Sequence, residues 1–348
     1  MAMDVRPLGK SGLNVSTVAL GCFAMGGRKW GDDVRDQDSI EAIRFAIDSG
    51  VNLLDTAASY GPGHSERVIG RAIRGIREKV VLATKVMVSF QDEDEVRLSL
   101  EDSLDNLGVD CIDLYQVHVP NRGDMDANLR VLEQMEQFRS QGRIRAIGVS
   151  NFSTEQLDQG REVAQIDSVQ PPYSLLWRYV EKDLLPYCQR YGIAVLAYSP
   201  LGQGILTGKY TGGVTFPQED SRRPNFLFQP KNIEDSLAVV DAAKNIGQAR
   251  GNTAAQVAIR WILQQSGVTS ALVGAKRPSQ VEDNLGSNGW ELSEDELQQL
   301  NKISQQVHDR RAITVPENLM LWEAVPDPFS ESTRRQIRQQ YLQSRVVS

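Results

Sequence analysis

Residues 51–61 read VNLLDTAASYG, an apolar run that ends on an aspartate and opens into a polar turn. Two later runs have the same form, VVLATK at residues 80–85 and CIDLYQVH at residues 111–118. Between such runs, apolar residues recur at helical spacing. Short apolar strands that alternate with helices of about 10–15 residues are typical of βαβ units in a parallel sheet.

The same alternation extends over most of the chain. Strands are expected at 17–20, 51–55, 80–85, 111–118, 143–149, 168–170, 192–198 and 270–274. Helices are expected at 38–49, 65–73, 94–107, 127–141, 154–161, 181–191, 254–265 and 278–285. Repeated right-handed βα units close most simply into a (β/α)₈ TIM barrel. An open doubly wound sheet is the alternative, but it normally carries a glycine-rich turn that Leu20–Gly27 lacks.

Three segments fall outside the repeat. Residues 5–16 resemble a hairpin with a Lys-Ser-Gly turn, which could close the bottom of the barrel. Residues 202–232 lack periodicity and are expected to form a long functional loop. Residues 304–348 form a C-terminal extension whose apolar Met320, Leu321 and Trp322 are expected to cover the barrel mouth or a partner subunit. We therefore expect one domain over 1–348, with its barrel at 17–303.

Composition limits the classes of partner that the protein is expected to bind. The net charge of −7 argues against binding to a nucleic-acid backbone. No apolar run approaches the roughly 20 residues of a membrane span, and Met1–Lys10 has no signal-peptide core. The three cysteines lack the spacing of a disulfide framework or a zinc site, so we expect no metal and a reducing cytoplasm. A monomer or homo-oligomer acting on a small molecule fits these features.

Four ionisable residues follow successive strands. Asp55 and Lys85 end their apolar runs, His118 ends the next, and Tyr60 lies in the turn after Asp55. In a parallel barrel all four would meet at the C-terminal rim, where barrels place their active sites. Each residue alone has an ordinary structural interpretation, such as a solvated rim residue or a packed aromatic, but the joint placement on consecutive strands favours a site.

Such a cluster suits the protonation of a carbonyl oxygen while hydride reaches the carbon. A free tyrosine has a pKa near ~10 and is a poor acid, but a nearby ammonium such as that of Lys85 lowers the pKa. Asp55 is the available counter-charge for Lys85, and His118 could hold the substrate oxygen. These residues predict a carbonyl reductase with Tyr60 as general acid.

Three other functions remain open on the residues alone. A slow-turnover redox-sensing or regulatory subunit would carry the same four residues. An isomerase or aldolase could use Lys85 as a Schiff base. A non-catalytic binding scaffold fits least well, because four catalytic residue types converge.

Several motifs together resemble the aldo-keto reductase family, to about residue 303. They are Asn52–Ala57 with Tyr60-Gly61, Ala83–Lys85, Asp113–His118, Gly148–Phe152, Tyr198–Gly204, and Gly274–Arg277 leading to Asn284. The Ser-Pro-Leu-Gly segment looks most like the bacterial branch that also includes potassium-channel β-subunits.

This resemblance implies NADPH across the barrel mouth. It implies that Ser150, Asn151 and Gln170 hold the carboxamide and that Tyr198 stacks under the nicotinamide. It implies pyrophosphate contacts from Ser199, Pro200, Leu201, Gly202, Gln203, Gly204 and Lys209, and adenosine contacts from Gly274, Ala275, Lys276, Arg277, Gln280, Asp283 and Asn284. Gly21 and Asp55 complete the expected cofactor site, and the expected substrate pocket comprises Phe23, Trp30, Tyr60, His118 and Trp177.

Gln280 departs from the family pattern. Many members carry an arginine there, four residues before the final asparagine, and it clasps the 2′-phosphate. Lys276 and Arg277 supply two positive charges earlier in the same loop. Phosphate favours arginine and lysine, so NADPH is still the expected cofactor.

Overall fold

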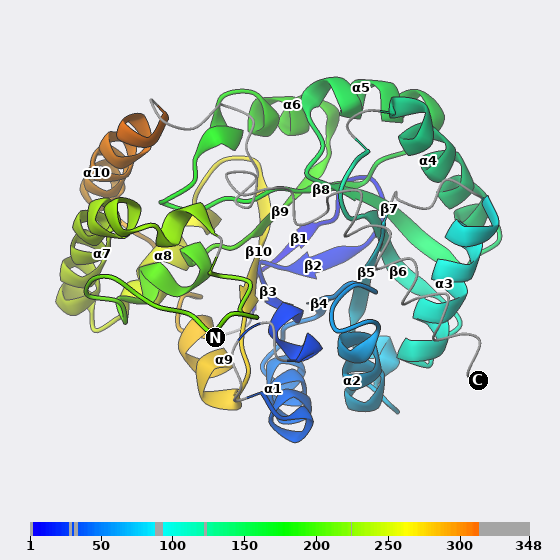
Figure 1. The fold of residues 1–348 in the computed structure, drawn as a ribbon, viewed down its shortest axis with the longest axis horizontal. Helices are drawn as coiled ribbons and strands as arrows, with labels where there is room; N and C mark the ends of the chain where they lie inside the picture. Colours follow the sequence, from blue (N-terminus) through cyan, green and yellow to red (C-terminus); the bar gives the residue numbers. More distant parts are fainter. Residues whose placement is uncertain are drawn as a thin grey trace.

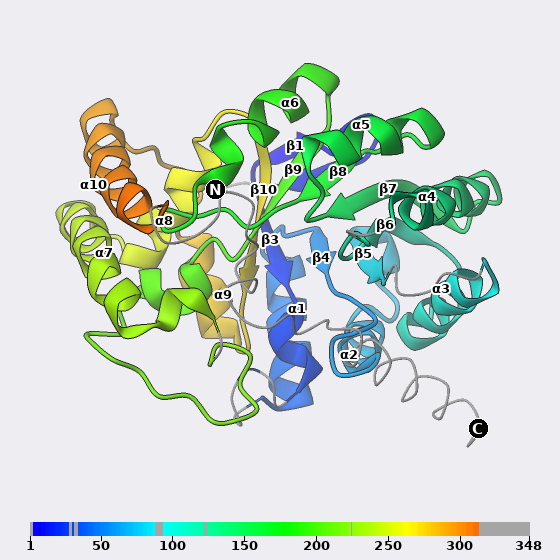
Figure 2. The ribbon, with the colours of Figure 1, turned by 45° about the horizontal axis from the view of Figure 1, so that its top comes forward.

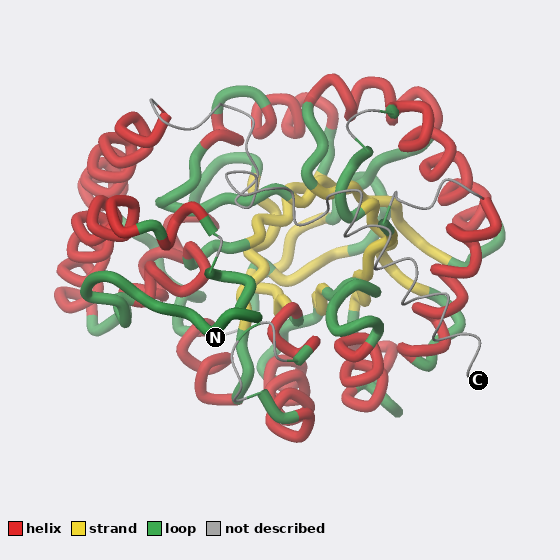
Figure 3. The backbone as a smooth tube through the Cα atoms, in the orientation of Figure 1, coloured by secondary structure: helices red, strands yellow, loops and turns green. Residues whose placement is uncertain are grey.

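A computed structural model describes residues 3–27, 30, 34–87, 93–121, 124–223 and 225–312. Its centre is a closed barrel of eight parallel strands in the order β10-β3-β4-β5-β6-β7-β8-β9. The strands form the core of the molecule and the helices surround them (Figures 1 and 3). The (β/α)₈ prediction is confirmed, and the open sheet is excluded.

The barrel strands are close to their predicted positions. They are β3 (Val18–Gly21), β4 (Leu53–Asp55), β5 (Val81–Val86), β6 (Ile112–Val117), β7 (Ile144–Ser150), β8 (Ser168–Gln170), β9 (Ala194–Tyr198) and β10 (Val268–Gly274). The predicted helices correspond to α1 (Asp36–Asp48), α2 (His64–Ala72), α3 (Glu93–Leu107), α4 (Met125–Ser140), α5 (Thr154–Val163), α6 (Leu184–Tyr191), α8 (Ala254–Leu263) and α9 (Pro278–Leu285).

Alternate residues of each strand face the barrel axis or the helices. The axial residues near the bottom are small or aliphatic, such as Ala83, Leu114 and Ala146, and form a core distinct from the one beneath the helices. By the same alternation, Lys85 in β5 and Gln116 in β6 also lie on the inward face. The period of two therefore turns these polar side chains toward the axis at the upper end.

The N-terminal hairpin closes the bottom of the barrel, as predicted. It consists of β1 (Val5–Pro7) and β2 (Asn14–Ser16), which lie across the barrel in the figures (Figures 1 and 2). Leu8 is fully buried in the axial core. Gly9 has a φ of +57°, and a Cβ there would lie 2.1 Å from the carbonyl oxygen of Asp167, so glycine is required.

Two helices were missed from the sequence. α7 (Pro230–Arg250) follows the loop, whose expected end at residue 232 is therefore wrong. Its buried face includes Asn232, Ser236 and Gly247, which obscure the apolar periodicity. α10 (Glu294–Ala312) packs on α7 and crosses the expected boundary at residue 304. Ser304 donates 2.6 Å to the carbonyl oxygen of Leu175, so the first part of the expected extension is docked on the barrel.

In its described residues, the loop between β9 and α7 has two short 3₁₀ helices, η4 (Gly202–Thr207) and η5 (Phe226–Phe228). The other short turns are η1 (Phe23–Gly26), η2 (Arg77–Lys79) and η3 (Tyr179–Glu181). No described helix is both long and apolar enough to cross a membrane. The apolar tail residues 320–322 lie outside the described part of the chain.

Candidate active site

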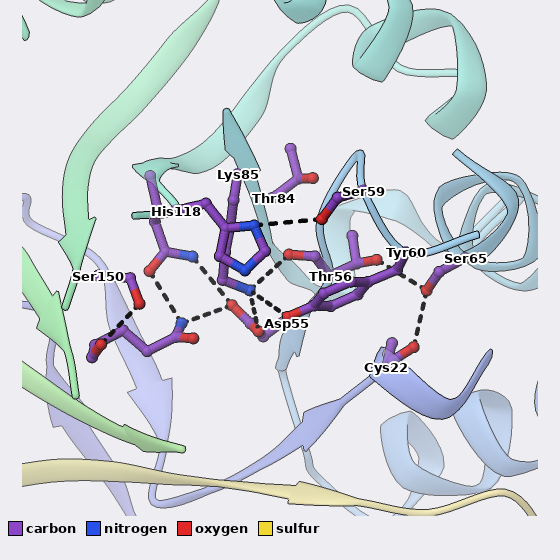
Figure 4. Close-up of polar contacts among 12 residues, drawn as sticks. Cys22, Asp55, Thr56, Ser59, Tyr60, Ser65, Thr84, Lys85, His118 and Ser150 are labelled. Carbon is purple, nitrogen blue, oxygen red and sulfur yellow. Dashed lines mark hydrogen bonds and ion pairs between the residues drawn. The ribbon is translucent and has the colours of Figure 1, made fainter. Parts of the chain in front are cut away.

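Asp55, Tyr60, Lys85 and His118 meet at the upper rim, although they come from three successive βα units (Figure 4). The Nζ atom of Lys85 donates to Asp55 Oδ1 at 2.6 Å and to the carbonyl oxygen of Thr56 at 2.7 Å. Its third contact is the hydroxyl of Tyr60, at 3.4 Å. The predicted convergence is present, with Lys85 at its centre.

Lys85 is charged despite complete burial of its side chain. Burial alone would lower its pKa, but Asp55 and Tyr60 act in the opposite direction and leave the pKa raised. A buried ion pair of this kind is tolerated only when the remaining donors and acceptors are satisfied. The three contacts of Nζ meet that condition.

Tyr60 keeps its proton in this arrangement. Burial raises the pKa of the phenol, and the Lys85 ammonium opposes that rise without cancelling it. The lysine acts in the expected direction, but the expected net lowering of the pKa is not what the structure shows. A protonated phenol whose oxygen already faces an ammonium can release its proton to a substrate with the developing phenolate stabilised.

His118 is a neutral imidazole. Burial, followed by the nearby Lys85 charge, holds its pKa well below 6.5. Its Nδ1 atom lies 3.4 Å from Ser59 Oγ, and its ring meets the Tyr60 ring edge-on at 5.6 Å between centroids. A neutral imidazole offers one N–H donor, so His118 can orient an uncharged carbonyl oxygen beside Tyr60.

Two glutamines complete the environment of Asp55. Oδ2 of Asp55 accepts hydrogen bonds from Nε2 of Gln116 at 3.0 Å and from Nε2 of Gln170 at 2.9 Å. Gln170 was expected at the site through the family resemblance, but Gln116 was missed. The inward parity that it shares with Lys85 and His118 could have identified it.

A cavity of about 1770 Å³ opens above these residues. Most of the expected site residues line it: Gly21, Phe23, Trp30, Asp55, Tyr60, His118, Ser150, Asn151, Gln170, Tyr198, Ser199, Pro200, Leu201, Gln203, Gly204, Lys209, Gly274, Ala275, Lys276, Gln280, Asp283 and Asn284. Lys85 lies beneath its floor. Gly202, Arg277 and Trp177 are not among the residues that line it.

Trp177 was expected in the substrate pocket, but it does not line the cavity. Its side chain is 3% exposed and packs edge-on against Tyr179 and Phe226, at 5.2 and 6.3 Å between ring centroids. The aromatic wall of the cavity comes instead from Phe23 and Trp30, whose ring centroids are 5.3 Å apart. The aromatic character of Trp177 serves packing.

Polar contacts fix the wall opposite Tyr60. Ser150 Oγ donates 2.8 Å to the backbone oxygen of Gln170, and the Tyr198 hydroxyl donates 3.0 Å to Oδ1 of Asn151. Asn151, Ser199 and Gln203 have φ values of 64°, 54° and 56°. Left-handed backbone at residues other than glycine costs energy and is concentrated at functional sites. These are the only such residues in the described part of the chain.

The far end of the cavity is arranged differently from the expectation. Lys276 Nζ donates 2.7 Å to the carbonyl oxygen of Trp30, and the Lys276 backbone N–H donates 2.7 Å to Gln280 Oε1. Arg277 is exposed and lies outside the lining. Of the two cations expected at this end, Lys276 therefore lines the cavity and Arg277 does not.

Hydroxyl groups support the rim from outside. Thr56 Oγ1 donates to Ser65 Oγ at 2.8 Å, and Ser65 in turn donates 2.9 Å to the carbonyl oxygen of Cys22 (Figure 4). Thr84 donates 2.7 Å to the buried Glu66. These contacts tie α2 to the turn after β4, to the residue after β3 and to β5. Single polar residues of this kind carry no distinctive sequence signal.

Comparison with known proteins agrees with this geometry. Residues 17–305 match the model of the Aldo/keto reductase family. The aldo-keto reductase YhdN of Bacillus subtilis (strain 168) is 38% identical over 312 residues, covering 86% of this chain and 93% of that protein. The NADH-specific methylglyoxal reductase of Escherichia coli (strain K12) is 31% identical, covering 84% and 95%.

Two solved structures are also similar. The glycerol dehydrogenase AKR11B4 from Gluconobacter oxydans has a TM-score of 0.75 and 39% identity, covering 91% of this chain and 97% of that one. An aldo/keto reductase from Klebsiella pneumoniae in complex with NADP and acetate has a TM-score of 0.71 and 30% identity, covering 87% and 96%.

The chain belongs to the aldo/keto reductase family. It is accordingly an oxidoreductase that acts on carbonyl or alcohol groups.

Proposed function

We propose that the protein reduces an aldehyde or ketone to an alcohol with NADPH, and that Tyr60 is the general acid. The observation that carries this proposal is the hydroxyl of Tyr60, which lies beside Lys85 and His118 at the floor of an open cavity. The residues present fit a nicotinamide cofactor. Polar groups of Ser150, Asn151 and Gln170 face one another along one wall, and Lys276 lies at the far end.

The cofactor supplies hydride to the carbonyl carbon when it is bound. His118 holds the carbonyl oxygen, and the Tyr60 hydroxyl transfers its proton to that oxygen as the alcohol forms. Lys85 stabilises the phenolate left on Tyr60, while Asp55 keeps Lys85 charged. Ser150, Asn151 and Gln170 would hold the carboxamide, Tyr198 would underlie the nicotinamide, and residues 199–204 with Lys209 would follow the pyrophosphate.

The choice of NADPH rests on Lys276, which lines the cavity at the adenosine end. The Klebsiella pneumoniae relative holds NADP, whereas the Escherichia coli relative is named for NADH. Gln280 cannot replace the arginine of the family pattern, because glutamine carries no charge and its Oε1 already accepts from the backbone N–H of Lys276. The preference for NADPH over NADH is therefore smaller than the preference that a bidentate arginine would give.

The cellular setting proposed is a reducing cytoplasm, with a small-molecule carbonyl compound as substrate and the protein as a monomer or homo-oligomer. All three cysteines are unpaired, and Cys22 and Cys188 are buried. Unpaired buried thiols are typical of proteins from a reducing compartment.

A panel of aldehydes, ketones and sugars tests the reaction, with NADPH oxidation followed by its absorbance. Turnover above the rate without a carbonyl compound is expected for at least one reactive aldehyde. NADPH binding without turnover across the panel would favour a redox-sensing or regulatory subunit. If NADPH does not bind, as judged by fluorescence, the proposal is wrong and a Schiff-base role for Lys85 becomes the better account.

A further inference from the structure

Gln116 is a fully buried residue of β6 that does not line the cavity. In the barrel it is paired in register with Lys85 of β5 and Gly148 of β7. A Cβ on residue 148 would lie 2.9 Å from Cγ of Gln116 and 2.6 Å from Oγ of Ser168. The absence of a side chain at Gly148 therefore makes the space that Gln116 occupies at the barrel axis.

Gln116, Gln170 and Asp55 form a closed triangle of hydrogen bonds. Both glutamines donate from Nε2 to Asp55 Oδ2, and Gln170 Nε2 also donates to Gln116 Oε1 at 3.1 Å. A carboxylate only accepts, so it must face the nitrogen of each amide. This requirement sets the orientation of both side chains.

The triangle uses both hydrogens of the Gln170 amide. Asp55 accepts one hydrogen and Gln116 accepts the other, which leaves the side-chain oxygen Oε1 as the remaining hydrogen-bonding group of the Gln170 amide. Gln170 lines the cavity, whereas Gln116 does not. Asp55 alone would fix only one hydrogen and would leave the amide free to turn about that bond.

We propose that Gln116 is a positioning residue that fixes the Gln170 amide so that its carbonyl oxygen accepts a hydrogen bond from the carboxamide NH₂ of a nicotinamide cofactor. The proposal rests on the proposed function, because it needs a nicotinamide in the cavity. Gln116 thereby links the carboxylate that serves Lys85 to the group that recognises the cofactor. An apolar residue at position 116 could fill the same space but could not accept the second hydrogen.

The test compares the binding of NADP⁺ with that of its 3-acetylpyridine analogue, in which a methyl group replaces the carboxamide NH₂. Dissociation constants from calorimetry need no turnover. The parent should bind NADP⁺ roughly threefold to tenfold more tightly than the analogue, the usual range for one hydrogen bond. In Gln116→Met the ratio should fall toward one.

Ser168→Ala is the matched control. Ser168 lies in the same layer, is fully buried, and its hydroxyl has no hydrogen-bond partner within the described residues. The variant disturbs the barrel axis without breaking the triangle, and it should keep the parent ratio. A folded Gln116→Met protein that also keeps the parent ratio would overturn the proposal.

Gln116→Glu covers the case in which the methionine variant does not fold. At mildly acidic pH a protonated carboxyl group at this position donates to Asp55 and accepts from Gln170, so the parent ratio should be retained there. Loss of the ratio under those conditions would also contradict the proposal. If the parent binds neither NADP⁺ nor the analogue, the proposed function fails, which is a different result from an unchanged ratio.

Discussion

Asp55 and Asp113 are both buried carboxylates of the barrel, at 4% and 1% exposure, but they lie at opposite ends of their strands. Asp113, near the start of β6, accepts from Arg77 at 2.6 Å, from Arg145 at 2.8 Å and from the Leu82 backbone N–H at 2.8 Å. The two arginine side chains are 30% and 56% exposed, so solvent shares their charge. Asp113 therefore braces β5, β6 and β7 together.

Asp55 faces a different kind of partner. Its counter-charge, Lys85, is completely buried, and the third contact of that ammonium is the Tyr60 hydroxyl at the floor of the cavity. A charge shielded from water acts strongly on its neighbours, which is what proton transfer requires. On the proposed function, an aspartate is therefore structural at position 113, where its partners reach solvent, and supports the chemistry at position 55, where its partner reaches Tyr60.

Replacement of Lys85 should produce a large effect on the reaction. Lys85→Met removes the ammonium that opposes the burial-driven rise of the Tyr60 pKa, so that pKa rises further. We expect kcat for carbonyl reduction to fall by about 10²-fold or more. Alcohol oxidation requires a phenolate, so its pH profile should move to higher pH. Lys79→Met, on an exposed residue, is the control and should leave both measurements unchanged.

Asp113→Asn should alter stability while sparing the chemistry. Loss of the charge weakens three hydrogen bonds at once, and we expect the free energy of unfolding to fall by about 1–3 kcal/mol. Urea titration measures this change, with the exposed Asp110→Asn as control. The kcat of the folded protein should stay within about twofold of the parent, because hydrogen-bond geometry at Asp55 does not depend on Asp113. A loss of kcat comparable to that of Lys85→Met would end the distinction between the two carboxylates.

The change in cofactor preference on neutralising the positive charges should be a smaller free-energy effect than those above. A solvent-accessible charge pair is worth about 1 kcal/mol, so neutralising Lys276 and Arg277 together should reduce the preference for NADPH over NADH roughly tenfold. Lys276→Met should account for the larger share, because Lys276 lines the cavity and Arg277 does not. The ratio of kcat/KM for the two cofactors gives the answer. Equal kcat/KM values for NADPH and NADH in the parent protein would refute the assignment.

The smallest effect expected is in the pH dependence of the parent enzyme. The pKa of His118 lies well below 6.5 and that of Tyr60 lies above 10.0, so between these values the histidine stays neutral and the tyrosine stays protonated. The kcat/KM for carbonyl reduction, measured with NADPH at saturation, should therefore be level across this interval. A step near neutral pH that disappears in His118→Asn would show that the imidazole titrates there.

The strand pattern predicted the barrel because its signals are local. Apolar runs such as residues 51–55 and 80–85 carry both the strand and the polar residue that ends it. The helix α7 was missed because small and polar residues share its buried face. The helix α10 was not predicted, and only its residues from 304 on were placed in the extension, since nothing in its polar sequence reveals its contacts with α7 and with Leu175.

The site was predictable as far as strand ends and family motifs define it. The hydrogen bonds of Gln116 join residues of β4, β6 and β8 at the axis, so no single segment reveals them. Trp177 was assigned to the pocket by residue type, whereas its position in the fold decides its role. The direction of the Tyr60 pKa shift could not be predicted from the sequence either, because it depends on how completely water is removed from the rim.

The most direct test of the upper rim is Tyr60→Phe, which keeps the ring and removes only the hydroxyl proton. Steady-state reduction of a reactive aldehyde by NADPH should be measured together with the dissociation constant of NADPH. We expect kcat to fall by about 10²–10⁴-fold while the dissociation constant changes by less than about twofold. A variant that retains nearly the parent kcat would contradict the assignment of Tyr60 as the proton donor.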